Sequence, residues 1–95
     1  MTEKAKYRSQ IRIYADILRA IEKERGNAKP THILYGANLS HDRLVKYLTQ
    51  LKESGLIEEI GASDRTAYSL TDRGIEFLKE FRKVLQFAEA FGFVI

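Results

Sequence analysis

The chain has 95 residues, a formal net charge of +3 and no cysteine, and 44% of its residues are hydrophobic. This length fits one domain with a modest core, and the lack of cysteine excludes disulfides and thiolate metal sites. The polar N-terminus shows no signal peptide and no apolar run approaches the ~20 residues that span a bilayer, so we expect a cytoplasmic protein without a membrane partner.

The first nine residues carry three cations, Lys4, Lys6 and Arg8, against one acid, Glu3. A basic start of this kind could contact phosphates, although a solvated, frayed terminus has the same composition. The mild positive charge of the whole chain likewise permits a polyanionic partner without requiring one.

A first helix is predicted from about Ser9 to Arg25. Its apolar residues recur at i, i+3, i+4 and i+7, which places them on one face: Tyr14, Ile17, Leu18 and Ile21. The charged residues lie toward the other side: Arg12, Asp16, Arg19 and Lys23. Gly26 and Asn27 end this helix, and Pro30 disfavours helical backbone at the residue before it, so a break follows.

A short helix over residues 31–37, a turn over 38–40 and a longer helix over 41–54 are predicted next. Ser40 is a good N-cap for the longer helix, and Gly55 suits the positive φ of the residue that follows its end. Between them leucines recur at spacings of four and three, which puts them on one face: Leu44, Leu48 and Leu51. The pattern fits a helix-turn-helix, and on its own it fits an ordinary amphipathic surface helix equally well.

Two short runs, residues 56–60 and 66–70, flank a turn-forming segment that contains Gly61. Alternation in the second run puts three residues on one face (Thr66, Tyr68 and Leu70), so the two runs are predicted to form a β-hairpin. Thr71 is a suitable N-cap for one more helix.

The complete order is helix, helix, turn, helix, hairpin, helix, which is the element order of a winged helix-turn-helix. We therefore predict a mainly α fold with a small β-hairpin, in which residues 1–71 form the winged domain and residues 72–95 a C-terminal helix of the same structural unit. An all-α surface helix would not explain the hairpin.

The last helix, from Asp72 to about Phe91, is unusually rich in large apolar residues. A small winged domain cannot cover all of them, and an exposed apolar patch of this kind marks an interface. We expect a homodimer with two-fold symmetry through this helix, whose dimerisation residues would be Ile75, Leu78, Phe81, Leu85, Ala88 and Phe91. The alternative is that the helix folds back wholly onto its own domain.

Three segments resemble a known family: residues 34–40, residues 48–57 and the Tyr-x-Leu-Thr-x-x-Gly element that begins at Tyr68. They are similar to the small archaeal winged-helix proteins that include the "10a" chromatin-type DNA-binding proteins and related predicted transcriptional regulators. The resemblance implies a nucleoid-associated protein that binds double-stranded DNA. It implies recognition by Ser40 to Gln50, a wing at Gly61 to Arg65, and an antiparallel coiled-coil dimer through Ile75 to Phe91.

Several polar side chains are predicted to contact DNA. Arg43 and Gln50 can form bidentate contacts with guanine and adenine edges, and Lys46 suits guanine or a phosphate. His41 and Thr49 flank these residues, and Ser40 precedes them. Candidate phosphate contacts, which would position the protein without reading sequence, are Arg8, Arg12 and Arg65.

Other functions have little support in the sequence. Ser40, His41 and Asp42 diverge by about 100° each at a helix start, so they cannot form a catalytic triad. No zinc-ligand spacing or phosphate-binding glycine loop is present, and we predict no enzyme activity, cofactor, metal or small-molecule substrate. The acidic pair Glu58 and Glu59 keeps one alternative open, a winged helix that binds another protein instead of DNA.

Overall fold

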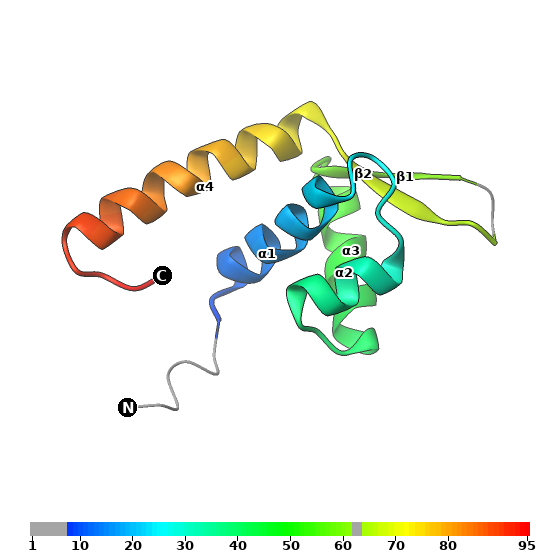
Figure 1. The fold of residues 1–95 in the computed structure, drawn as a ribbon, viewed down its shortest axis with the longest axis horizontal. Helices are drawn as coiled ribbons and strands as arrows, with labels where there is room; N and C mark the ends of the chain where they lie inside the picture. Colours follow the sequence, from blue (N-terminus) through cyan, green and yellow to red (C-terminus); the bar gives the residue numbers. More distant parts are fainter. Residues whose placement is uncertain (1–7, 62–63) are drawn as a thin grey trace.

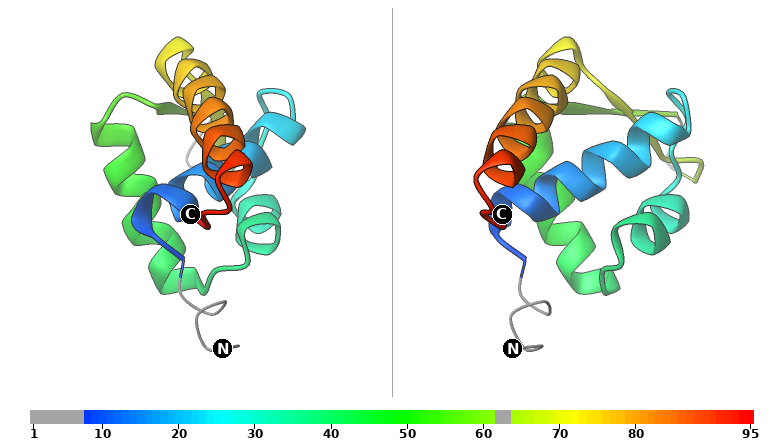
Figure 2. Two further views of the ribbon diagram at one scale, coloured as in Figure 1. Left: turned by 90° about the vertical axis from the view of Figure 1, so that its left-hand side faces the viewer. Right: turned by 60° about the vertical axis from the view of Figure 1, so that its left-hand side comes forward.

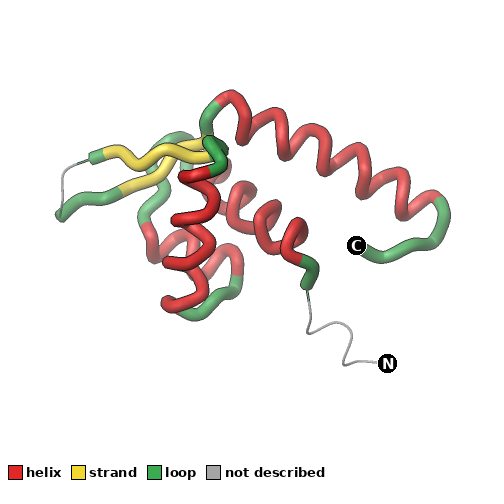
Figure 3. Tube along the Cα trace, turned by 180° about the vertical axis from the view of Figure 1, so that it is seen from behind, coloured by secondary structure: helices red, strands yellow, loops and turns green. Residues whose placement is uncertain are grey.

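The computed structural model describes residues 8–61 and 64–95. Within these ranges the elements are α1 (Gln10–Lys23), α2 (Pro30–Ala37), α3 (His41–Glu53), β1 (Ile57–Ile60), β2 (Ala67–Leu70) and α4 (Asp72–Ala90). The order is the predicted one, and the fold class, mainly α with a two-stranded antiparallel hairpin, is confirmed. The hairpin and the C-terminal end of α4 lie at opposite ends of the molecule (Figure 1; Figure 3).

Helix α1 is the centre of the core, because α2, α3 and α4 surround it (Figure 2). Its buried residues therefore occupy more than the single predicted face: Ile13, Ala15, Ile17, Leu18, Ala20 and Ile21. The helix begins after Ser9, whose side chain accepts a hydrogen bond from the Arg12 amide at 3.1 Å. The predicted face is buried except for Tyr14, which is half-buried and reaches α3.

Close packing of α2 on α1 depends on Gly36. A Cβ atom added there would lie 2.9 Å from the Cβ of Ala20. The turn that follows α2 passes through Asn38, which has a left-handed φ of 55°, and it buries Leu39 beneath α2 and α3. The predicted helix-turn-helix is therefore present and tightly packed.

The hairpin pairs Ile57 with Leu70 and Ile60 with Ala67. The loop before α2 adds a bridge on the free edge of β2, where Ala28 and Tyr68 exchange backbone hydrogen bonds of 3.1 and 2.8 Å. Tyr68 and Leu70 lie on one face of β2, as every second residue of a strand does. Ala67 is buried as well as Tyr68, so burial itself does not alternate along β2.

The junction between the hairpin and α4 is built on Thr71. Its hydroxyl donates to the Gly55 carbonyl at 2.6 Å and accepts from the Gly74 amide at 3.1 Å. Gly74 is required here, because a Cβ atom would lie 2.1 Å from the carbonyl oxygen of Leu56. This junction attaches α4 directly to the segment that ends α3. No helix in the described ranges is long and apolar enough to cross a membrane.

Candidate nucleic-acid interface

Helix α3 presents one buried and one exposed face, as the leucine spacing predicts. Leu44, Leu48 and Leu51 are buried. The helix begins after its N-cap Ser40, whose side chain accepts a hydrogen bond from the Arg43 amide at 3.4 Å, and ends before Gly55, whose φ is +77°. Each end therefore has a local cause in the sequence, and the outward face is fixed by the packing of the leucines.

The exposed face of α3 carries mixed charge. Lys46 lies near its centre, with Arg43 on one flank and Thr49 on the other, at about 100° of rotation per residue. Asp42 and Glu53 are exposed on the same side of the helix. The face can offer hydrogen-bond donors and acceptors to base edges, but it is not a uniform basic patch.

Gln50 is held against α1. Its side-chain oxygen accepts a 2.7 Å hydrogen bond from the Tyr14 hydroxyl. The Tyr14 ring also packs edge-on against Tyr47 with 5.9 Å between centroids, and the Arg43 guanidinium lies 5.8 Å from the centre of the Tyr47 ring. Gln50 and Arg43 therefore lie on the flank of α3 that faces α1.

Arg8 and Arg12 are engaged within the fold. Arg8 donates to the carbonyls of Ala37 and Asn38 at 2.7 and 3.0 Å, and to the Asp16 carboxylate at 2.9 Å. Arg12 lies 3.7 Å from Asp16 and 5.9 Å from the centre of the Phe81 ring. Arg12 is two residues from the α3-contacting Tyr14, a rotation of about 200°, so the structure does not bring Arg12 together with the exposed face of α3.

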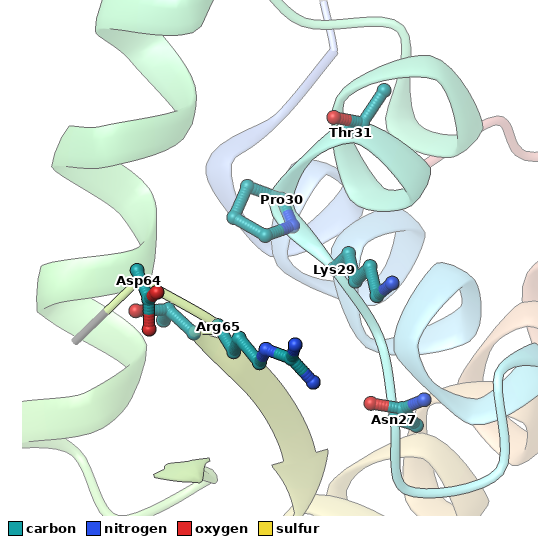
Figure 4. A pocket seen from close by; sticks show the side chains of 7 residues that line it. Asn27, Lys29, Pro30, Thr31, Asp64 and Arg65 are labelled. Carbon is teal, nitrogen blue, oxygen red and sulfur yellow. The ribbon is translucent and has the colours of Figure 1, made fainter. Parts of the chain in front are cut away.

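Arg65 lies beside a hollow of about 540 Å³ between the hairpin and the start of α2. Its side chain extends across the hollow toward the loop that carries Asn27 and Lys29 (Figure 4). Lys29 is a second cation on this surface and is not among the predicted contacts, although its place at the start of a helix was a usable signal. Residues 62–63 of the predicted wing, and Lys4 and Lys6 of the basic N-terminal segment, lie outside the described residues.

A second hollow, of about 300 Å³, lies between α2, α3 and the hairpin. Apolar side chains form most of it, and its lining includes Tyr35, His41, Val45 and Tyr68. Tyr35 is 76% exposed and Val45 is 49% exposed. Val45 is not among the predicted contacts of α3, which are all polar. The usable signal was an aliphatic residue outside the leucine spacing.

An ion pair neutralises part of the negative charge of the hairpin. Lys52 on α3 donates to the Glu59 carboxylate on β1. The hydrogen bond to Glu59, and then its charge, raise the pKa of Lys52. Burial raises the pKa of Tyr68, and the negative charge of Glu59 adds to that increase. The negative charge of Glu59, which would repel DNA from the hairpin, is therefore neutralised by a lysine of α3.

The structure divides the predicted dimerisation residues of α4. Leu78, Phe81 and Ala88 are buried against the chain's own core, and Leu85 is half-buried there. Ile75 and Phe91 are exposed. The alternative in which the helix folds back onto its own domain therefore accounts for Leu78, Phe81, Leu85 and Ala88. Of the predicted set, Ile75 and Phe91 remain exposed to a partner.

A second apolar line follows α4 at heptad spacing. It consists of Phe77, Val84 and Phe91, with Phe87 beside the last two. The rings of Phe87 and Phe91 lie 5.0 Å apart, and both side chains are more than 60% exposed. Ile75 is rotated from Phe87 by about 120° around the helix. It faces a different hollow, formed with Ile21 and Leu70, so it does not belong to this line.

Comparison with known proteins identifies the arrangement. A family model described as winged helix-turn-helix matches residues 7–89. Among solved structures, the chain is similar to Sso10a-2, a DNA-binding protein from Sulfolobus solfataricus, with 27% identity and a TM-score of 0.78 over 88% of this chain and 85% of that one. This match confirms the expected resemblance to the "10a" proteins.

The regulator MepR of the Staphylococcus aureus multidrug efflux pump MepA shares the fold at 16% identity, with a TM-score of 0.71 over 82% of this chain and 59% of MepR. The MarR family transcriptional regulator SPO1453 from Silicibacter pomeroyi DSS-3 does so at 15% identity, with a TM-score of 0.64 over 94% of this chain and 62% of that one. A search of curated proteins found no match.

Proposed function

This chain belongs to the winged helix-turn-helix family, and we propose that it binds double-stranded DNA with α3 in the major groove and the hairpin alongside. The observation that carries the proposal is the division of α3 into a leucine face packed on the core and an exposed face around Lys46. A protein of similar structure over most of its length, Sso10a-2, is described as a DNA-binding protein.

The proposed phosphate contacts lie in two places, at the hollow between the hairpin and α2 and on the exposed face of α3. Lys29 and Arg65 flank the hollow beside the N-terminus of α2, where a helix end and two cations oppose the one carboxylate of Asp64 and favour an anion. Lys46 adds a contact from the exposed face of α3. Arg8 and Arg12 take part less, because their guanidinium groups already bind Asp16 and neighbouring groups.

The protein acts as a homodimer through α4. A soluble monomer would leave Val84, Phe87 and Phe91 in water, at exposed fractions of 49, 63 and 65%. Apolar side chains at heptad spacing pair with a second helix, and a two-fold axis is the simplest way to cover them. A dimer would present two α3 helices to DNA. The biological role is transcriptional regulation or chromatin organisation.

The test is the fluorescence anisotropy of a labelled random-sequence duplex across a series of salt concentrations. We expect a Kd of micromolar or tighter at low salt, and a linear fall of log affinity with log salt whose slope counts the phosphates neutralised. Absence of binding at low salt would contradict the proposal. It would favour a protein-binding winged helix, for which the exposed Tyr35 and Val45 offer an apolar surface.

A further inference from the structure

We propose that Val45 and Thr49 give α3 a methyl-bearing surface that contacts the C5-methyl group of thymine in the major groove. This inference rests on the proposed DNA binding and adds the chemical group that the helix reads. It assigns to the protein a preference for duplexes that carry thymine at the contacted positions.

Val45 is not part of the buried leucine face of α3. It is next to Leu44 in sequence, but the rotation of about 100° between them takes it out of the leucine face, and 49% of its side chain is exposed. A β-branched residue on the outside of a helix also has a lower helix propensity than the Lys, Arg or Gln side chains around it. The position therefore favours an apolar contact with something outside the chain.

Thr49 extends the same apolar surface by one turn. Its hydroxyl donates to the backbone carbonyl of Val45 at 3.0 Å, so this donor is committed within the helix. The remaining branch of the side chain is a methyl group. Residues four apart lie next to each other on a helix, so the methyl groups of Val45 and Thr49 are neighbours on an exposed face.

The surface beside Val45 is recessed. The hollow of about 300 Å³ between α2, α3 and the hairpin includes Val45, Leu48 and Tyr35 in its lining. A group that projects from the floor of a DNA groove can therefore enter between the helices instead of meeting a flat surface. Lys46, adjacent in sequence, is placed to contact a phosphate or a guanine on the same duplex.

Thymine is the base that presents an apolar group on the major-groove edge, its C5-methyl, beside the O4 acceptor. Uracil keeps the O4 acceptor and the pairing with adenine but lacks that methyl. 5-Methylcytosine adds the same methyl to a G·C pair. These two replacements change the contacted group while the hydrogen-bonding pattern of each base pair is kept.

The experiment compares the Kd of the full chain for an A·T-rich duplex with its Kd for the same duplex in which uracil replaces thymine. We expect about fourfold weaker binding for each contacted methyl that is removed. A G·C-rich duplex should gain affinity by a similar factor when 5-methylcytosine replaces cytosine. Equal affinities within each pair would overturn the inference while leaving DNA binding intact.

Two substitutions assign the effect to these residues. V45A removes two methyl groups, and T49S keeps the hydroxyl that bonds to the Val45 carbonyl but removes the methyl. Both should lower the ratio between uracil and thymine Kd values toward one. I11A is the control and should leave the ratio unchanged, because Ile11 is an exposed aliphatic residue on α1 and not on α3. A ratio that persists in both variants would overturn the assignment, and absence of binding to every duplex would remove the proposed function as well.

Discussion

The Gln50 side-chain oxygen accepts a 2.7 Å hydrogen bond from the Tyr14 hydroxyl, which in turn accepts one from Gln10 at the same distance. A glutamine reads adenine by accepting from N6 with its oxygen and donating to N7 with its amide. The bond from Tyr14 occupies one of the two lone pairs of this oxygen and ties the amide to α1. The role of Gln50 in the described structure is to join α3 to α1.

Replacing Tyr14 by Phe tests this role. The variant keeps the ring that packs on Tyr47 but removes the hydroxyl, so we expect a loss of about 1 kcal/mol in the free energy of unfolding, measured by urea denaturation. DNA affinity should stay within about twofold of the wild type, because the free energy of one neutral hydrogen bond is lost from folding and not from binding. A large gain in affinity for adenine-containing sites would show instead that Tyr14 restrains a base reader.

Lys46→Ala should weaken DNA binding roughly uniformly across sequences and reduce the salt slope by about one. The lysine is exposed at the centre of the outer face of α3, where it can neutralise a phosphate. The matched control is Lys79→Ala, which removes an exposed lysine from α4 and should leave both the affinity and the slope unchanged. Equal effects of the two variants would place the DNA on another surface.

Gly74→Ala should destabilise the fold by about 1–3 kcal/mol, since the added methyl meets the Leu56 carbonyl and neither backbone segment can move away cheaply. Gly36→Ala is the comparison. Its methyl would lie 2.9 Å from the Cβ of Ala20 and 3.8 Å from its Cα, and the better helix propensity of alanine offsets this contact by up to about 1 kcal/mol. Thermal unfolding should rank the two variants in this order. A Gly74 variant as stable as the wild type would contradict the packing described here.

Phe87→Lys should convert the proposed dimer to a monomer, because it would place a charge next to the exposed Val84 and Phe91 of α4. Ile75→Lys introduces the same charge at an exposed residue on a different side of the helix and should leave the dimer intact. Sedimentation equilibrium at micromolar concentration measures both. A wild-type mass equal to one chain would remove the dimer, and dissociation by the Ile75 variant alone would move the interface to the other flank.

Alkaline pH should destabilise the protein through Tyr68 and Lys52. Both groups have a pKa that is raised in the folded state, so the stability they contribute is complete below their unfolded pKa values and is lost as pH rises through the folded ones. We expect the free energy of unfolding to fall above about pH 10. Tyr68→Phe should make this fall shallower, and an unchanged profile in that variant would assign the effect to other groups.

Local signals predicted the helix ends and the fold class. Ser40 and Thr71 cap their helices, and Gly55 has the positive φ that its position demands, because each of these features is decided within a few residues of the chain. The periodic leucines fixed the buried face of α3 for a similar reason. Element order and these local signals together were enough to predict the winged helix.

Contacts between distant segments were not predictable in the same way. The bond between Gln50 and Tyr14 spans 36 positions, and no sequence pattern near either residue predicts it. The sequence pattern predicted that the apolar residues of α4 form one surface. Because one side of α4 packs on α1, Leu78 is buried while Phe87 is exposed. The sequence shows which residues are apolar, whereas the direction from which a neighbouring helix arrives decides which of them are covered.

The hydrogen bonds of Thr71 link the orientation of α3 to that of α4. One hydroxyl oxygen joins the end of the α3 turn to the first turn of α4, and the Thr71 amide adds a bond to the Leu56 carbonyl at 3.1 Å. In a dimer held through α4, the orientation of each α3 would therefore depend on the angle at which the two α4 helices cross.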